Sequence, residues 1–460
     1  MNLLVVLTFF SVMLARYLVE GVRILPGYAK LLPELMSAIA LLVVLARLLG
    51  GSRIRLDWRY GLFFGLLFFI IFFGFFAQSM DAGPMVGGLR FYLKALPFFL
   101  LPAVYPFTER QIKVQFVWLF LLVCLQTPVA FYQKYVQFRT MWHTGDNITG
   151  TVAASGQMSI IMVCTIAALV VLYLRDKLRF IPFLIGVGFL LAPTTINETK
   201  ITLILLPLVV ALPALFMPRG QRSLRKLVPI LVTGGVAVVT FFSVYAYYAS
   251  FQKYGQDLGS FVENKTYKNY LLNGGDKHRS EIIGRGDTLI YAYNRIKQDP
   301  LVFAFGVGAG NASRTQWKIF EGKYSKLYTP MGIGQTQVTY FLWEIGFVGL
   351  FAYLFLFYSA FRDAVFLSRS DSPFAHVGQA WATAVVILGI SLLYESIMGM
   401  DELQYAFWFY SGFCATKAWE LRAAARAAPT RRLTAQPGRS SVQQPVTPVT
   451  ADARVAASLN

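Results

Sequence analysis

The stretch YGLFFGLLFFIIFFGFFAQ, residues 60–78, carries no charged side chain and is long enough to cross a bilayer as one helix. Comparable apolar runs follow along the chain, at residues 2–22, 32–50, 90–107, 113–133, 157–174, 180–196, 200–217, 227–248, 337–361, 376–398 and 404–419. Of the 460 residues, 56% are hydrophobic and 14% are charged, whereas soluble proteins carry roughly a quarter charged residues. This composition argues against a soluble enzyme, a secreted disulfide scaffold or a disordered chain. It predicts an all-α polytopic membrane protein with about twelve transmembrane helices.

The basic residues are concentrated in alternate short loops between these runs. Arg53, Arg110, Arg175 and Arg222 are examples, while most intervening short loops hold few cations. Because cytoplasmic loops carry an excess of Lys and Arg, this pattern predicts that both termini are cytoplasmic. It also accounts for most of the net charge of +19, so we expect no nucleic-acid partner.

This orientation leaves one long outer segment, residues 249–336, between the ninth and tenth runs. The segment is polar but rich in aromatic residues, which favours an ordered, partly helical cap over a linker. The predicted organisation is a membrane domain at 1–248, the outer loop at 249–336, a second membrane part at 337–419 and a tail at 420–460. The tail is rich in Ala, Pro, Ser, Thr and Gln, and we expect it to be disordered in the cytoplasm.

No recognisable motif for a metal or a cofactor is present. The cysteines, Cys124, Cys164 and Cys414, lie inside apolar runs, and His143, His278 and His376 have no metal-ligand spacing. The sequence also has no P-loop, HExxH, CxxC or GxSxG motif. We therefore expect neither a metal nor a cofactor.

Two clusters of charged residues lie where a lipid environment makes charge costly. In GGLRFYLKAL, Arg90 and Lys94 share one helix face at the outer end of the fourth run, which favours an anion bound between them. The alternative is that they snorkel to the outer headgroups. In TTINETKITLIL, Lys200 opens the eighth run after a polar turn; the alternative is a plain hairpin in which Lys200 pairs with Glu198.

A third cluster lies in the outer loop, in HRSEIIGRGDTLIYAYNRIKQDPLVFAFGVGAGNASR. We expect Asp287 to cap a helix from about 288 to 298, followed by Pro300 and a glycine-rich turn. The apolar stripe of this helix is Leu289, Tyr293 and Ile296. The guanidinium groups suited to gripping phosphate in bidentate fashion are Arg279, Arg285, Arg295 and Arg314. The alternative is a solvated basic loop that meets anionic headgroups.

The fourth cluster is GIGQTQVTYFLWEIGFVGL, at the start of the tenth run. Its hydrogen-bonding groups at the outer boundary include Gln335, Gln337 and Tyr340, and Glu344 lies deeper. Gly346 and Gly349 favour close packing. Near the last outer loop, Glu395, Asp401 and Glu402 can serve as counter-ions for the cations above or act in catalysis. Together the clusters predict a lipid-linked phosphate or pyrophosphate ligand in the outer leaflet.

At these residues the chain resembles the O-antigen polymerase and ligase superfamily, bacterial membrane glycosyltransferases that use undecaprenyl-diphosphate-linked glycans. The resemblance extends over residues 60–410. It rests most on Arg285 before TLIYAYNRIKQD, Pro300 and FGVGAG, and also on Lys200 in NETKITLIL, where arginine is commoner in the family, and on GGLRFYLK. Ligases of the superfamily carry a His, then Asn, Ser or Gln, nine residues and GxxG. Here Gln335 stands in place of that histidine, which favours a polymerase.

The resemblance implies a polymerase of O-antigen, capsule or exopolysaccharide at the periplasmic face of the bacterial inner membrane. The alternatives are a ligase that transfers glycan to lipid A-core and, in another class, a lipid-linked oligosaccharide flippase. The expected partners are the lipid-linked donor and acceptor, the bilayer, and a chain-length regulator or secretion complex. The expected catalytic residues are Arg285, Lys200, Glu198 and Asp287. The residues expected to bind diphosphate or sugar are Arg90, Lys94, Arg279, Arg314, Gln335, Gln337 and Tyr340.

Overall fold

A computed structural model describes residues 1–139, 145–197, 199–218, 220, 224–250, 284–313, 315 and 318–427. Every regular element in this part of the chain is a helix, so the predicted all-α class is confirmed. The chain divides into two units, Met1–Glu420 and Leu421–Asn460. The site lies in the first unit. Most of the predicted tail, residues 428–460, lies outside the described residues.

The described helices follow the apolar runs. The α-helices are α1 (Asn2–Arg16), α2 (Leu32–Leu49), α3 (Trp58–Ala77), α4 (Ala82–Leu93), α5 (Leu96–Val104), α6 (Glu109–Tyr132), α7 (Ser155–Leu174), α8 (Phe180–Ile196), α9 (Ile201–Phe216), α10 (Leu224–Ser250), α13 (Arg285–Ile296), α14 (Pro300–Phe305), α15 (Lys323–Tyr328), α16 (Gln337–Ser368), α17 (Ala375–Ser391) and α18 (Asp401–Ala427). The short 3-10 and π segments are η1 (Tyr17–Gly21), η2 (Gly27–Leu31), η3 (Gln133–Gln137), η4 (Gly145–Asn147), η6 (Lys318–Phe320), η7 (Thr329–Met331) and η8 (Ile397–Gly399).

Seven of the described helical segments are long and apolar enough to cross a membrane, and α4 with α5 makes an eighth if this pair, bent by 41°, is one span. The apolar helices α8, α9 and α17 are shorter, and α18 begins with two acidic residues. The part of the chain that the structure describes is therefore all-helical, with seven or eight candidate membrane spans. The expected count of about twelve is not confirmed.

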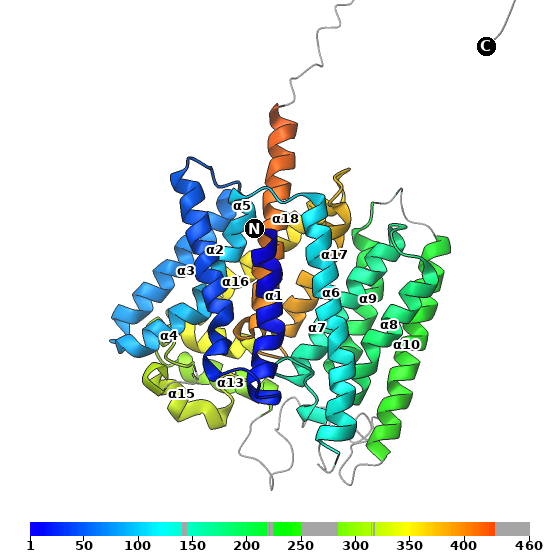
Figure 1. The fold of residues 1–460 in the computed structure, drawn as a ribbon. Coiled ribbons are helices and arrows are strands. Elements are labelled where there is room, and N and C mark those ends of the chain that lie inside the picture. The colour runs from blue at the N-terminus through cyan, green and yellow to red at the C-terminus, as the bar shows by residue number, and fades with distance from the viewer. Residues whose placement is uncertain are drawn as a thin grey trace, which may run out of the picture. The chain divides into compact units, whose positions relative to one another are not determined.

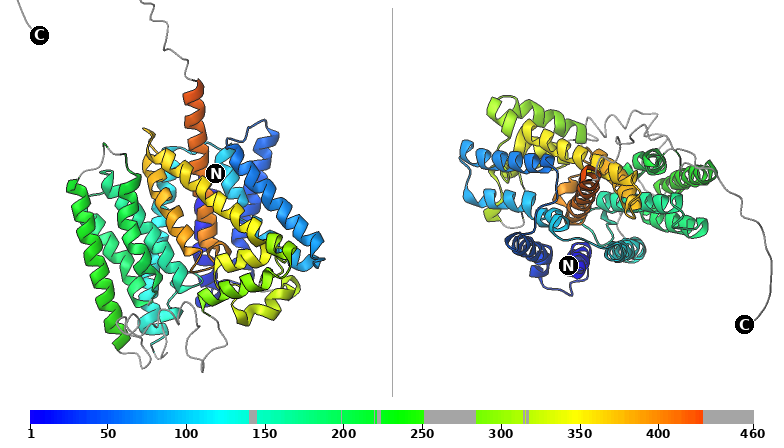
Figure 2. Two further views of the ribbon diagram at one scale, coloured as in Figure 1. Left: turned by 180° about the vertical axis from the view of Figure 1, so that it is seen from behind. Right: turned by 90° about the horizontal axis from the view of Figure 1, so that it is seen from above.

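Helix α16 has a central place in the first unit, where it packs against α3, α17, α13 and α14. Figure 1 shows α8, α9 and α10 side by side, and α13 and α15 at the end opposite the N-terminus. The views in Figure 2 show the same grouping from behind and from above. The segments that carry most of the predicted site residues thus meet around the N-terminal half of α16.

A buried ion pair joins α3 to α16. Arg59 Nη2 lies 3.0 Å from Asp363 Oδ1, and the Tyr60 hydroxyl donates to Asp363 Oδ2 at 2.8 Å. Their side chains are 5% exposed for Arg59 and 0% for Asp363. A charge so deeply buried is tolerated only when it is paired. We therefore assign Arg59 and Asp363 a structural role.

The predicted helix of the outer loop begins earlier than expected. Helix α13 starts at Arg285, and its N-cap is Gly284, so the prediction that Asp287 caps it is wrong. Its buried face is Thr288, Ala292 and Ile296, whereas Tyr293 is exposed. Of the predicted stripe, Ile296 is buried, Leu289 is half-buried, and the ring centroid of Tyr293 lies 6.3 Å from that of Phe347 on α16. Residues 251–283 of the predicted cap lie outside the described residues.

Helix α16 is broken at Gly346, where the backbone has φ +63° and ψ −165°. The break leaves the carbonyls of Trp343 and Glu344 without their helical donors. The amides of Val307 and Gly308, in the glycine-rich turn after α14, supply hydrogen bonds of 2.7 and 3.1 Å. A Cβ on Gly346 would lie 2.6 Å from the Gly306 nitrogen, so the predicted close-packing role of this glycine is confirmed.

Candidate functional site

The connection between α17 and α18, residues 392–400 and hereafter the α17–α18 turn, holds Arg285 in place. Arg285 Nε donates to the Tyr394 carbonyl at 2.8 Å, and its guanidinium lies 4.2 Å from the centroid of the Tyr394 ring. Stacking and a hydrogen bond together fix the plane of the guanidinium. Arg285 is therefore a preorganised cation at the start of α13.

Glu395 follows Tyr394 and faces the start of α7. A Cβ on Gly156 would lie 3.0 Å from Glu395 Oε2. Burial raises the pKa of Glu395 above its ordinary value of 4.5, while the charge of Arg285 opposes this rise. The turn therefore brings a partly desolvated carboxyl and a fixed guanidinium into one electrostatic neighbourhood.

Gln337, the first residue of α16, lies against the same turn. Gln337 is fully buried, and its Oε1 accepts from the Met398 amide at 2.8 Å and from Ser396 Oγ at 3.2 Å. Its backbone amide donates to the Glu395 carbonyl at 3.2 Å. Gln337 thus braces the turn. The Oε1 of Gln335 is buried and has no hydrogen-bond partner among the described residues.

Tyr340 and Glu344 form a buried group one to two turns further along α16. The Tyr340 hydroxyl contacts Ser313 Oγ, which also donates to Glu344 Oε1 at 2.6 Å. The amide of Ala312 donates to the same Glu344 oxygen at 3.2 Å. The Tyr340 ring centroid lies 4.6 Å from that of Phe91 on α4. Tyr340 thus links the segment after the glycine turn to the helix that carries Arg90 and Lys94.

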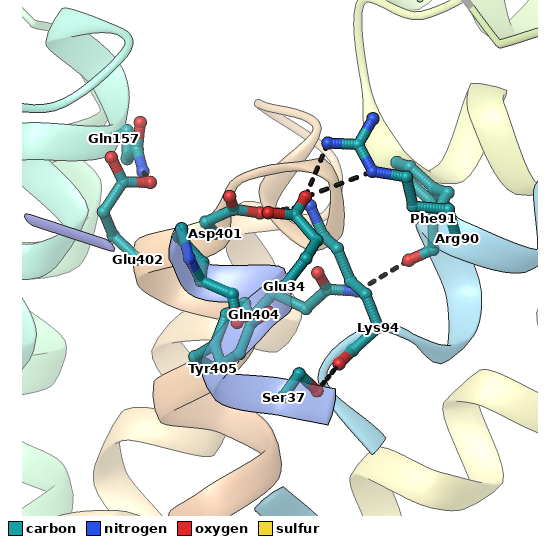
Figure 3. A network of polar contacts seen from close by, with 11 residues as sticks. Glu34, Ser37, Arg90, Phe91, Lys94, Gln157, Asp401, Glu402, Gln404 and Tyr405 are labelled. Atoms are coloured by element: carbon teal, nitrogen blue, oxygen red, sulfur yellow. Dashed lines mark hydrogen bonds and ion pairs between the residues drawn. The ribbon is translucent and has the colours of Figure 1, made fainter. Parts of the chain in front are cut away.

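Two other predicted cations of the membrane part, Arg90 and Lys94, lie together beside Glu34 and Asp401 (Figure 3). Arg90 on α4 pairs with Glu34 on α2, its Nε lying 3.1 Å from Oε1. Lys94, at the break between α4 and α5, pairs with Asp401 at the start of α18. The counter-ion interpretation therefore holds for Asp401. Lys94 is 11% exposed, so it does not snorkel freely into water.

Two hydrogen bonds extend this group toward α7 and α4. Gln157 near the start of α7 donates to the Glu402 carboxylate, and Gln404 Nε2 donates to the Phe91 carbonyl at 2.8 Å. Figure 3 shows Glu402 and Gln157 on one side of the α18 start and Arg90 with Lys94 on the other. Residues 394–404 are therefore the shared neighbour of α4, α7, α13 and α16.

Lys200 lies at the N-cap of α9, beside the beginning of α7. The preceding Asn197 donates from Nδ2 to the Ser155 carbonyl at 3.0 Å and to Ser159 Oγ at 2.9 Å. The hydroxyls of Thr199 and Thr202 are buried without a hydrogen-bond partner among the described residues. Of the predicted turn, Asn197, Thr199 and Lys200 are described while Glu198 is not, and α7 connects this segment with the neighbourhood of Glu395.

Some predicted residues cannot be placed. Glu198, Arg279 and Arg314 lie outside the described residues. Asp287 lies in the first turn of α13, where desolvation raises the pKa of its carboxyl above the ordinary 3.8. Sequence reasoning did not anticipate that Tyr394 would hold Arg285. A tyrosine beside a glutamate in the last outer loop is the only local signal that points to it.

We expect the Lys94–Asp401 pair to be structural as well as electrostatic. Lys94→Asp places two carboxylates together and should lower stability by about 2 kcal/mol, because the pair is largely shielded from water. Adding Asp401→Lys restores opposite charges and should recover most of the loss. Thermal unfolding of both variants in detergent measures this, and a double variant no more stable than Lys94→Asp would contradict the pairing.

Among the residues that the structure covers, no group of three or more His, Cys, Asp or Glu side chains could hold a metal ion. A scan against models of protein families found no match to this chain. A search among curated proteins also found no similar sequence.

Proposed function

We propose that this protein is a polymerase that joins undecaprenyl-diphosphate-linked oligosaccharide units into O-antigen, capsule or exopolysaccharide at the periplasmic face of the bacterial inner membrane. The observation that carries the proposal is the stacking of Arg285 on the α17–α18 turn, next to Glu395. A fixed guanidinium beside a carboxyl suits the departure of a diphosphate and the loss of a hydroxyl proton. The family resemblance supplies the substrate class.

In this reaction a hydroxyl oxygen of the acceptor unit bonds to the anomeric carbon of the donor glycan. The bond from that carbon to the diphosphate oxygen breaks, and undecaprenyl diphosphate leaves with the electron pair. Arg285 and Lys200 stabilise the charge that develops on the leaving group. The hydroxyl proton passes to a carboxylate. Glu198 and Asp287 are candidates from the sequence, and Glu395 joins them through its position beside Arg285.

The remaining residues bind rather than react. Arg90, Lys94, Arg279 and Arg314 are assigned to the diphosphates of donor and acceptor. Lys94 lies at a helix break, and charged groups at interrupted helices suit ion and substrate sites in membrane proteins. Gln335, Gln337 and Tyr340 are assigned to the sugar hydroxyls, with Gln335 best suited because its carbonyl oxygen has no partner among the described residues.

The pH dependence of polymer formation tests Glu395. A base must be deprotonated, and burial raises the pKa of this carboxyl above 4.5. Activity should therefore fall as the pH decreases through the raised pKa. Glu395→Gln should lower the rate and remove this acid limb. Rates measured between about pH 4.5 and 8 decide the point, and an unchanged profile in the variant would exclude Glu395 as the base.

Purified protein supplied with an undecaprenyl-diphosphate repeat unit tests the function itself. We expect a ladder of longer lipid-linked glycans, resolved by product size. If product forms only after lipid A-core is added, the protein is a ligase that works without the family's histidine. If neither mixture forms a bond but the substrate crosses vesicle membranes, the protein is a flippase. A chain-length regulator or a secretion complex can be tested as a partner by adding it to the mixture of protein and repeat unit.

A further inference from the structure

Helix α14 packs against the candidate spans α3 and α16 inside their ends, and the glycine-rich turn that follows it, residues 306–310, packs against the last turn of α3 and against α4. We propose that this segment is submerged in the hydrocarbon layer of one leaflet, with lipid acyl chains as its partner. It would then be a re-entrant element rather than part of a hydrated cap. This inference does not depend on the proposed enzymatic function.

The depth follows from α3. The Phe305 ring centroid lies 4.5 Å from that of Phe73 and 5.9 Å from that of Phe69. Along a helix that rises about 1.5 Å per residue, these positions lie roughly 6 and 12 Å before Ala77, the last residue of α3. A leaflet's hydrocarbon layer is about 15 Å thick, and α3 is about long enough to span both leaflets. The Phe305 ring therefore lies at acyl-chain depth.

The contacts of α14 with α16 also indicate acyl-chain depth. The Phe303 ring centroid lies 4.4 Å from that of Phe347, which follows the break in α16. One turn further, Phe351 is 62% exposed, as expected for a lipid-facing position of a span. On the α3 side Phe69 is 53% exposed, and on α14 Leu301 is 52% exposed. The exposed apolar surface thus continues from α3 across α14 to α16.

The backbone of the glycine turn has internal hydrogen bonds, which a position at acyl-chain depth requires. Polar backbone groups away from water need internal partners, and irregular backbone is tolerated there only inside protein. The amides of Val307 and Gly308 donate to the carbonyls exposed by the break in α16, and the Asn311 amide donates to the Gly308 carbonyl at 3.1 Å. A Cβ on Gly308 would meet the Met80 sulfur and lie 3.2 Å from the Gly74 carbonyl oxygen, and one on Gly310 would meet the Pro84 carbonyl, so the turn packs against the last turn of α3 and the start of α4.

The cations nearest the segment fit a headgroup layer above it. Arg295 and Lys297 close α13 just before α14, and both are exposed. Lys297 Nζ lies 5.3 Å from the Tyr293 ring centroid and donates to Asn294 Oδ1 at 2.7 Å. Anionic phospholipid headgroups complement these charges. The polar boundary therefore lies between α13 and α14.

Spin labels in liposomes of phosphatidylglycerol and phosphatidylethanolamine test the proposal. The label is placed at Leu301→Cys, with the exposed Lys326→Cys on α15 as control, in a chain whose Cys124, Cys164 and Cys414 are alanine. We expect the label at 301 to be relaxed more by oxygen than by a water-soluble nickel chelate, and the control to show the reverse. Equal access of the chelate to both labels would overturn the proposal.

A photocrosslinking residue at position 301 of the otherwise native chain provides a second measurement, because it needs no cysteine replacement. Irradiation in the same liposomes should give lipid adducts detectable by mass. The same residue at position 326 should give few. A lack of enrichment at 301 over 326 would contradict the acyl-chain contact, whatever the catalytic activity of the protein proves to be.

Discussion

Arg285→Ala is expected to reduce polymer formation by about 100-fold or more, the usual effect of removing one preorganised group that stabilises developing charge. The side chain is held by the Tyr394 carbonyl at 2.8 Å and by the Tyr394 ring. Arg285→Lys keeps the charge but loses the planar stacking, so we expect it to restore little activity. The measurement is the rate of ladder formation from a purified lipid-linked repeat unit.

Arg295→Ala is the matched control on the same helix. Arg295 is exposed, and its Nη1 donates to Gln298 at 2.8 Å rather than to the α17–α18 turn. This variant should retain most of the activity. The role of Arg285 would be refuted if Arg285→Ala formed polymer within about threefold of the unmodified protein, a difference of less than 1 kcal/mol in activation free energy.

Gly346→Ala should destabilise the protein by about 2–6 kcal/mol. The backbone conformation with φ +63° and ψ −165° is strained for a residue with a side chain, which costs of order 1–3 kcal/mol. The new Cβ would also lie 2.6 Å from the Gly306 nitrogen, and such overpacking typically costs another 1–3 kcal/mol. Thermal unfolding in detergent and the yield of folded protein measure the loss.

Gly65→Ala on α3 is the control for this variant. A Cβ there meets no atom within 4 Å, and alanine is favoured over glycine in a helix by up to about 1 kcal/mol. Its stability should be unchanged or slightly higher. If both alanine variants unfolded at the same temperature, the break at Gly346 would not be a constraint on the fold.

The sequence predicts the helices well because apolar runs in lipid have few alternatives to helix. It predicts less about the break in α16, since Gly346 alone does not reveal that Val307 and Gly308 replace the missing donors. The error at Asp287 has a similar origin. Capping rules weigh local residues, whereas the packing of α13 on α16 places Thr288 inward.

The sequence predicts the types of residue in the candidate site better than it predicts their contacts. Cations near membrane boundaries are conspicuous, because charge there is costly. Their partners come from distant parts of the chain: Tyr394 for Arg285, Asp401 for Lys94 and Glu34 for Arg90. No local pattern joins such residues, and the packing of α2, α4, α13, α18 and the α17–α18 turn brings them together.

An anion that binds to Arg90 or Lys94 competes with the carboxylate that already pairs with that cation. Arg90 and Lys94 each face a carboxylate in the folded chain, so a phosphate that takes the same position competes with Glu34 or Asp401. The affinity for phosphate then depends on how much more strongly the cation pairs with phosphate than with its carboxylate, rather than on the attraction of an unpaired cation. A diphosphate offers several oxygens to each cation, while a simple monovalent anion offers little more than the carboxylate it replaces. If a diphosphate binds here, the exchange of ion pairs would let the site discriminate among anions without a large positive potential.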